Sequence, residues 1–158
     1  MVKFVFDADG AIKLAHAGVL SVLATQTVCI MPQAAYNEVM KGKEHMYEDA
    51  FIIEALVEGK KLSIVKAVAS NHTNIGLCER SVITAFHKYR ADVIVSDDAK
   101  FLSILEQEHT AFITPTDIIV WLVIHNRLSV QESLAALEKI RPFVRQSAYE
   151  NALKTIQR

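Results

Sequence analysis

The amino-acid sequence predicts an α/β fold of three Rossmann-like layers, in which a central, mainly parallel sheet of about five strands is flanked by helices. Short runs rich in Val, Ile and Phe alternate along the chain with longer segments of helical periodicity, which is the order typical of β-α-β units. Apolar residues make up 51% of the 158 residues and charged residues 22%, so the chain has the composition of one compact domain.

The strands are expected in the short β-rich runs, near residues 2–6, 27–31, 62–65, 92–96 and 111–113. Helices are expected in the longer segments, near residues 9–24, 33–41, 46–58, 75–90 and 98–108, and three more follow to the end of the chain. Neither a linker nor a repeat interrupts this order. We therefore expect a single domain over residues 1–158.

Capping residues predict the helices in the last third of the chain. Thr114-Pro115 offers a cap followed by a proline at the first helical position. Ser129 with Glu132 fits the capping box, in which each residue satisfies the backbone donor of the other, and so does Ser147 with Glu150. These residues indicate structure rather than chemistry, and they predict a helical appendage from about residue 115.

Charge and motifs exclude several classes of protein. The 17 Lys and Arg residues against 18 Asp and Glu residues give a net charge of −1, so a bound polyanion would have to be held locally rather than by bulk charge. Cys29 and Cys78 form no CxxC pair, and the sequence has neither an HExxH motif nor a glycine-rich phosphate loop. Residues 2–6 do not form a signal peptide, and the longest apolar run, 118–124, is too short for a membrane span. We expect a cytoplasmic protein with no membrane contact.

Acidic residues follow the predicted strands where parallel sheets place their binding sites, beyond the carboxyl ends of the strands. Asp7 comes directly after the first strand, and Asp97 and Asp98 come just after the fourth. Glu38 lies early in the helix that follows the second strand. Glu79 lies near the start of the helix that leads into the fourth strand, so it is expected at the same end of the sheet.

Such a group of carboxylates favours a hard divalent cation. Taken singly, the aspartates are ordinary helix caps and the glutamates ordinary helix residues. Buried together, carboxylates repel one another unless a cation compensates, and oxygen ligands suit Mg²⁺ or Mn²⁺. The predicted metal ligands are Asp7, Glu38, Glu79, Asp97 and Asp98, and all of them except Asp97 form the predicted catalytic set. Asp9 and Ser96 are expected to support these ligands.

At these positions the sequence resembles the PIN-domain family of metal-dependent nucleases. Residues 5–12, VFDADGAI, resemble the family's first strand with its aspartate, and residues 31–39, MPQAAYNEV, are similar to its Pro-to-Glu helix. Residues 76–81, GLCERS, resemble its Gly-x-Gly-Glu helix start, and residues 96–101, SDDAKF, its Thr-x-Asp-x-x-Phe segment. No single motif is specific, but four in order with suitable spacing make a strong match.

More narrowly, the whole length resembles the VapC-like stand-alone PIN nucleases, which form the toxin halves of toxin–antitoxin pairs. This resemblance implies a three-layer PIN fold and a ribonuclease that uses Mg²⁺ or Mn²⁺ to cleave RNA phosphodiester bonds with an activated water. It also implies a small antitoxin protein as a partner, and we expect a homodimer. Basic residues near the predicted ligands are candidates for contacting RNA, namely Lys13, Arg80 and Lys100, with Lys41 and Lys43 as further candidates.

Two positions depart from the pattern of this subgroup. Cys78 stands where the subgroup usually has glycine, and Ser81 stands where many members carry a second glutamate. The loss of that acid would weaken a metal site, although Asp9 could compensate. These departures keep open an alternative function, that of a catalytically degenerate PIN module that binds nucleic acid or protein.

A second alternative is a phosphatase. The segment Phe6-Asp7-Ala8-Asp9-Gly10 also fits the Asp-x-Asp-Gly opening of haloacid dehalogenase-type phosphotransferases, in which the first aspartate is the nucleophile and the second an acid. That mechanism needs a later lysine before an acidic pair, and Lys88 stands closer to Asp97 than we would expect. It also leaves both glutamates without a role, so we rank it below the nuclease.

Overall fold

The computed structural model describes residues 1–45 and 47–158, and its centre is a five-stranded sheet in which every strand is parallel to its neighbours. The strands are β1 (Lys3–Phe6), β2 (Val28–Pro32), β3 (Ser63–Val65), β4 (Val93–Val95) and β5 (Phe112–Ile113). Each of them lies within one residue of a predicted run, so the expected α/β fold with a parallel sheet of about five strands is confirmed.

The strand order is β3-β2-β1-β4-β5, with β1 at the centre. From β1 the chain first builds outward through β2 and β3, and then returns to place β4 on the other side of β1. The order therefore reverses between β1 and β4, and the crevice outside their carboxyl ends is where open parallel sheets bind ligands. In the register, Phe6 of β1 is opposite Val95 of β4, so both strands end at the same level.

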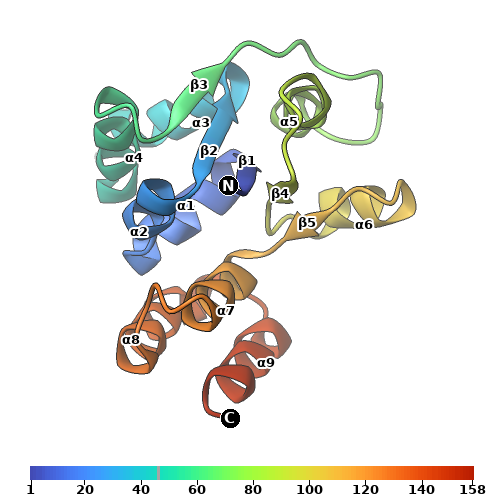
Figure 1. Ribbon diagram of the computed structural model, residues 1–158. Coiled ribbons are helices and arrows are strands. Elements are labelled where there is room, and N and C mark those ends of the chain that lie inside the picture. Colours follow the sequence, from blue (N-terminus) through green and yellow to red (C-terminus); the bar gives the residue numbers. More distant parts are fainter. Residues whose placement is uncertain (46) are drawn as a thin grey trace.

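Helices cover both sides of the sheet (Figure 1), with α1 to α4 on one side and α5 and α6 on the other. Their bounds are α1 (Ala8–Ala17), α2 (Leu20–Gln26), α3 (Gln33–Glu44), α4 (Glu48–Glu58), α5 (Leu77–Lys88) and α6 (Ala99–Gln107). The predicted helix near 46–58 begins at Glu48 in the structure, and residue 46 lies outside the described residues. This arrangement is the three-layer one expected of the fold class.

The first predicted helix, 9–24, is two helices that are divided at Gly18. Gly18 has φ of 80°, a left-handed conformation that favours glycine, and its amide donates to Leu14 and Ala15. Val19 follows it and donates to Leu14 at 3.1 Å, so α1 ends in a closed turn before α2 begins. The apolar periodicity continues through both helices, which is why the pattern alone did not show the break.

Three further helices end the chain, namely α7 (Pro115–Ile124), α8 (Val130–Ile140) and α9 (Gln146–Ile156). The predicted cap at Thr114 is confirmed, and so is the capping box of Ser129 with Glu132. The second capping box, Ser147 with Glu150, is wrong. Helix α9 already begins at Gln146 after Arg145, so Ser147 lies inside the first turn and cannot cap it.

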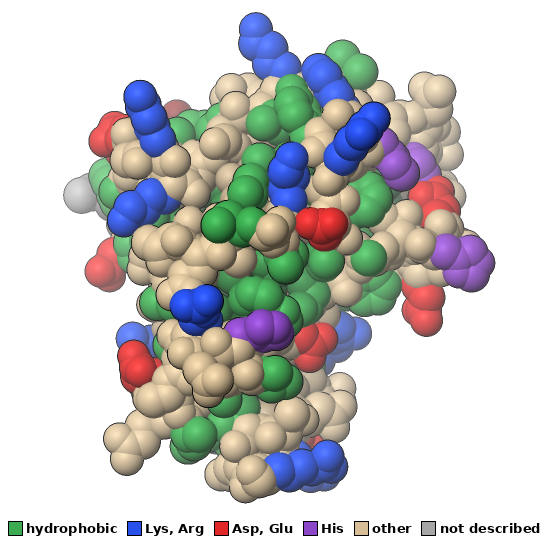
Figure 2. All heavy atoms as spheres, viewed as in Figure 1, with side chains coloured by type: hydrophobic (Ala, Val, Ile, Leu, Met, Phe, Trp, Pro, Cys, Tyr) green, Lys and Arg blue, Asp and Glu red, His purple; other side chains and the backbone are tan. Residues whose placement is uncertain are grey.

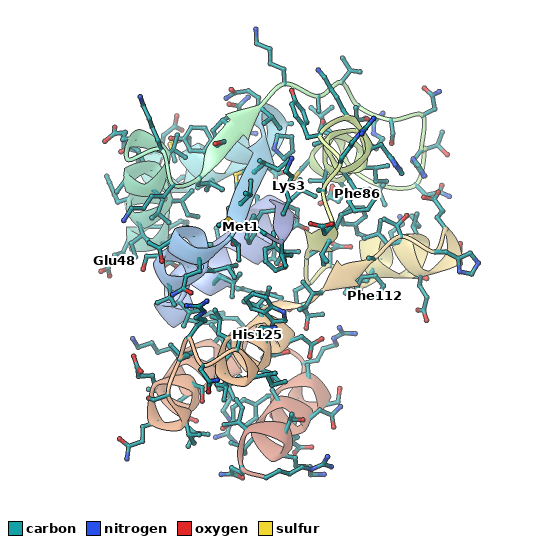
Figure 3. All side chains as sticks on the ribbon, in the orientation of Figure 1. Met1, Lys3, Glu48, Phe86, Phe112 and His125 are labelled. Atoms are coloured by element: carbon teal, nitrogen blue, oxygen red, sulfur yellow. The ribbon has the colours of Figure 1, made fainter. Side chains whose placement is uncertain are left out.

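The C-terminal helices pack against the same apolar core as the sheet. Ile118, Ile119 and Leu122 of α7 are fully buried, and the ring of Trp121 meets Phe4 of β1 edge to face at 5.7 Å between centroids. His125, which stacks on Trp121, lies between the sheet and these helices in Figure 3. The end of the chain is therefore held against β1, the strand that carries Asp7.

The face shown in Figures 2 and 3 is the one on which the strands begin, with Met1 and Lys3 toward the viewer. Hydrophobic side chains cross the middle of this face, and many Lys and Arg side chains gather above them (Figure 2). The carboxyl ends of the strands point to the opposite side of the molecule. Over the described residues, every helix is too short or too polar to cross a bilayer.

Candidate functional site

Asp7 lies at the crevice between β1 and β4. Its amide donates to the carbonyl of Val95 at 3.2 Å, which continues the pairing of the two strands by one residue. Its side chain is 1% exposed and caps α1, because Oδ1 accepts the amide of Gly10 at 2.7 Å. The other oxygen, Oδ2, accepts the hydroxyl of Ser96 from the end of β4.

Gly10 allows this close approach of helix and strand. A Cβ at this position would lie 2.7 Å from the carbonyl oxygen of Val95 and 3.0 Å from Oδ1 of Asp7. The first contact is shorter than real Cβ atoms make, and it is to backbone that cannot move away cheaply, while the second is tighter than most real contacts. The glycine is therefore needed for α1 to start against β4 with the Asp7 carboxylate between them.

The surroundings of Asp7 favour its protonated form. The pKa of the Asp7 carboxyl is raised from 3.8 to about 7, chiefly because the group is buried; the hydrogen bonds from Ser96 and Gly10 oppose the shift, and the negative charges of Asp9 and Glu79 add to it. An aspartate with this pKa gives up its proton near neutral pH when a cation arrives. Strongly perturbed acids of this kind gather at functional sites.

Glu38 and Glu79 come from α3 and α5. The pKa of the Glu38 carboxyl is raised by burial and then by the charges of Glu79 and Asp9, while Lys41 opposes the shift. Glu79 stands in the first turn of α5, and a Cβ on Gly76 would lie 2.9 Å from its Oε2. The structure therefore brings Asp7, Glu38 and Glu79 close enough for each to act electrostatically on another member of the set.

Asp98 reaches the site through Ser96. Its Oδ1 accepts the amide of Phe101 at 2.8 Å and caps α6, and its backbone amide donates to the Ser96 hydroxyl oxygen at 3.2 Å. The Ser96 side chain, which is fully buried, thus joins Asp98 to Asp7. The role of Ser96 as a support for metal ligands stays a prediction, and the structure shows it hydrogen-bonded to both aspartates.

Asp97 is engaged by a cation from the protein itself. Its side chain is 5% exposed, and Oδ2 accepts Nζ of Lys13 at 2.7 Å. Lys13 also lies 3.1 Å from Oδ2 of Asp9, and Arg145 approaches Oδ1 of Asp97 at 3.9 Å. The role of Asp97 as a metal ligand stays a prediction, because the structure shows it as the partner of Lys13.

The residues proposed to contact RNA differ in whether their side chains already have a partner within the protein. Lys13 is taken up by Asp9 and Asp97, and Lys43 donates to Glu54 of α4. Lys41 and Lys100 are exposed. Nε of Arg80 is buried and finds no hydrogen-bond partner among the described residues. Arg145 was missed, since nothing in the sequence pattern connects the start of α9 with the end of β4.

The two positions that depart from the family pattern are both buried in α5. Cys78 is 2% exposed, and burial raises the pKa of its thiol, with nearby Asp7, Glu38 and Glu79 adding to the shift and a hydrogen bond to the Ala8 backbone opposing it. A thiol with a raised pKa is uncharged and inert. Ser81 is 1% exposed. Its hydroxyl is uncharged, so it does not replace the charge of the glutamate that many members of the subgroup carry.

The donor set fits a hard divalent cation by its chemistry. Its members are carboxylates, and two of them, Asp7 and Glu38, have pKa values raised by burial and by the charges of Glu79 and Asp9. Within the part of the chain that is described, no three acidic, histidine or cysteine side chains are close enough to enclose an ion by themselves. Mg²⁺ is commonly held by one or two carboxylates and retains several waters, so such an open arrangement suits it better than Ca²⁺ or Zn²⁺.

Comparison with known proteins agrees with the fold. A family model described as a PIN domain matches residues 3–158, which is nearly the whole chain. The chain therefore belongs to the PIN-domain family, whose members are typically nucleases and generally use divalent metals. No curated protein sequence matches the chain significantly.

The family match also weighs against the phosphatase alternative. Lys88, the lysine that mechanism would require, lies in the last turn of α5 and donates to the carbonyl of Lys66 at 3.1 Å. The carboxylates with raised pKa values include Glu38, which a phosphatase would leave without a role.

Proposed function

We propose that this protein is a divalent-metal-dependent ribonuclease that hydrolyses RNA phosphodiester bonds. The observation that carries the proposal is the buried Asp7 carboxyl, which lies at the switch point of the sheet with a pKa raised to about 7. Asp9 and Glu79 repel its charged form, and among the described residues its oxygens are bonded by the Gly10 amide and the Ser96 hydroxyl rather than by a cationic side chain. A structure retains such an arrangement at a cost in stability, which is typical of functional sites.

The residues of the chain have separate tasks in this proposal. Asp7, Glu38, Glu79 and Asp98 would hold the ion, which supplies Lewis acidity toward water and phosphate when it is bound. Ser96 orients Asp7 through its hydroxyl and Asp98 through its backbone amide. Asp7 releases its proton from the carboxyl oxygen as the ion binds, so binding is coupled to pH. Lys13 keeps the charge of Asp97 neutralised beside them.

A catalytically degenerate binding module is the second candidate. The observation in its favour is Ser81, which is buried and uncharged where many relatives of the proposed subgroup have a second glutamate. Such a module would bind RNA or a protein without cleaving it. Cleavage is the property that separates the two candidates.

The test is cleavage of single-stranded RNA by the purified chain with Mn²⁺ or Mg²⁺, compared with the same reaction in a chelator. Asp7→Asn is expected to abolish metal-dependent cleavage without loss of the fold, and Glu106→Gln, which changes an exposed acid on α6, serves as the matched control. RNA binding without cleavage in the parent protein would favour the degenerate module. Metal-dependent hydrolysis of a small phosphomonoester that requires Asp9 would instead support the phosphatase.

We further propose that the ribonuclease acts as a toxin, with a small neighbouring-gene product as its inhibitor. Expression of this chain alone is then expected to arrest growth, and Asp98→Asn is expected to relieve the arrest. Asparagine caps helices about as well as aspartate, so α6 should persist in this variant. Normal growth on expression of an active ribonuclease would contradict the toxin role and leave the enzymatic proposal intact.

A further inference from the structure

A cavity of about 320 Å³ opens beside the carboxylate site, between α1, the start of α4 and the connection from α8 to α9. This volume is at the small end of the range for ligand pockets, and it suits one ring system with its immediate substituents. The lining residues are Asp9, Ile12, Lys13, His16, Tyr47, Asp49 and Phe143. The activity proposed above uses only Asp9 and Lys13 of these residues.

Two exposed aromatic rings line the cavity. Tyr47 is 62% exposed and Phe143 is 56% exposed, although aromatic side chains of this size are usually covered. His16 meets the Phe143 ring edge to face at 5.1 Å between centroids, with the two planes at 86°. An edge-to-face contact covers one face of one ring only, and the exposure of Phe143 leaves aromatic surface available to a flat ligand.

The cavity shares two of its lining residues with the surroundings of the carboxylate site. Asp9 and Lys13 line it, and the charge of Asp9 contributes to the raised pKa of Asp7. Lys13 also bonds Asp97 at the end of β4. In an RNA strand with one phosphate at the carboxylates, we therefore expect the neighbouring nucleotide to lie near this cavity.

Two carboxylates in the lining of the cavity can accept hydrogen bonds from a ligand. Asp49 lies with Oδ2 at 3.2 Å from Nδ1 of His16, and a carboxylate has lone pairs beyond the one that this contact uses. Asp9 supplies a second carboxylate to the lining of the cavity. Such a lining repels a phosphate and accepts hydrogen bonds from the N–H groups of a neutral ring.

We propose that this cavity binds one nucleobase of a single-stranded RNA substrate, next to the phosphate at the carboxylate site. This inference rests on the proposed ribonuclease function. The base stacks on the aromatic surface of Phe143 and Tyr47, and its N–H edge donates to Asp49. Single-stranded RNA is commonly recognised by stacking of unpaired bases on aromatic side chains. Cytosine, which has an amino group where uracil has a carbonyl, is the better ligand of the two pyrimidines.

The experiment measures binding without cleavage. A fluorescently labelled oligocytidylate is titrated with the full chain in a chelator, and the affinity is read from anisotropy. Phe143→Ala is expected to weaken binding about 5- to 100-fold, the range of a lost base–aromatic stack, and Phe143→Trp is expected to retain it. Phe51→Ala is the matched control, because Phe51 is a partly exposed ring on α4 outside the cavity. Oligouridylate should bind the parent several-fold more weakly, and Asp49→Asn should narrow that difference.

The results that would contradict the base site can be told apart from those that would contradict the ribonuclease proposal. Affinity that is unchanged by Phe143→Ala, or equally lowered by Phe51→Ala, would overturn the base site while the ribonuclease proposal stands on its cleavage assay. Equal affinity for the two oligonucleotides would overturn the role of Asp49. If Phe143→Ala leaves RNA binding intact but converts a dimer to a monomer, the cavity wall contacts a second copy of the chain and binds no base. Absence of any RNA binding and cleavage would remove both proposals.

Discussion

Lys13 of α1 donates from Nζ to Oδ2 of Asp97 at 2.7 Å and thereby ties the first helix to the loop that follows β4. The aspartate is 5% exposed and the lysine 15%, so the pair is largely shielded from water. Pairs of this kind are costly to break from one side, because the remaining charge is left without compensation.

We therefore expect Lys13→Met to destabilise the fold by about 1–3 kcal/mol, since the methionine keeps the apolar stem and removes the charge. The measurement is urea unfolding in the absence of metal. Lys43→Met is the control, because Lys43 pairs with Glu54 at a more exposed position and should change stability less. Equal losses of stability in the two variants would show that the Lys13–Asp97 pair contributes no more to stability than the more exposed Lys43–Glu54 pair.

Asp7 makes stability depend on pH. The folded protein keeps a proton on this carboxyl up to about pH 7, whereas the unfolded chain loses it near pH 3.8. The folded state binds more protons over this window, so its free energy of unfolding falls as the pH rises through it. Asp7→Asn removes this loss, and the metal-free variant should be more stable than the parent by a few kcal/mol above about pH 7.

The measurement is the difference in unfolding free energy between Asp7→Asn and the parent, taken in a chelator from about pH 4 to about pH 8. The difference should grow with pH. A constant difference would mean that Asp7 is ionised across the whole range. Added Mg²⁺ should stabilise the parent and have little effect on the variant, since a ligand stabilises only a state that binds it.

Removal of the Ser96 hydroxyl should change the pH dependence in a defined direction. The hydrogen bond from Ser96 lowers the pKa of Asp7, so Ser96→Ala is expected to raise that pKa further. Mg²⁺ binding, measured by calorimetry, should then require a higher pH than it does in the parent. An unchanged pH midpoint would indicate that Asp7 releases no proton on metal binding.

Gly10→Ala tests the close approach of α1 to β4. The added methyl group meets the carbonyl of Val95 and Oδ1 of Asp7, and we expect a loss of about 1–3 kcal/mol in stability together with loss of metal-dependent cleavage. Gly42→Ala is the control, because the one tight contact of its methyl, at 3.1 Å, would be with the ring of Tyr47, which is exposed and can move, and its contact with Ala50 at 3.9 Å is an ordinary one. Full activity in Gly10→Ala would contradict the positioning of Asp7 described above.

The sheet was predictable because its strands are short apolar runs separated by longer periodic segments. The place of Asp7 followed from the same pattern, since a residue after a central parallel strand must lie at the carboxyl edge. The break between α1 and α2 at Gly18 was not predicted. Apolar spacing continues across it, and only the backbone angle of the glycine shows the turn. Ser147 fits a capping box by spacing alone, but the helix starts at Gln146, before it.

The charge partners could be foreseen only in part. Lys13 was predicted to lie near the ligands as a contact for RNA, but its pairing with Asp9 and Asp97 depends on the rotamer of a long side chain that could reach several acids. Arg145 approaches Asp97 from another part of the chain, and no local pattern encodes that contact. The cavity beside α1 likewise joins residues from three distant segments, so its existence depends on tertiary packing.

The hydroxyl of Ser96 has a single proton, and the structure aims it at Oδ2 of Asp7 in a fully buried place. A proton so enclosed exchanges slowly with solvent and should give its own resonance in a proton NMR spectrum. Its chemical shift responds to the protonation state of the carboxyl group that accepts it, and so it should move when an ion replaces the proton of Asp7. The hydroxyl is therefore a built-in reporter of occupancy, which can be read without any RNA.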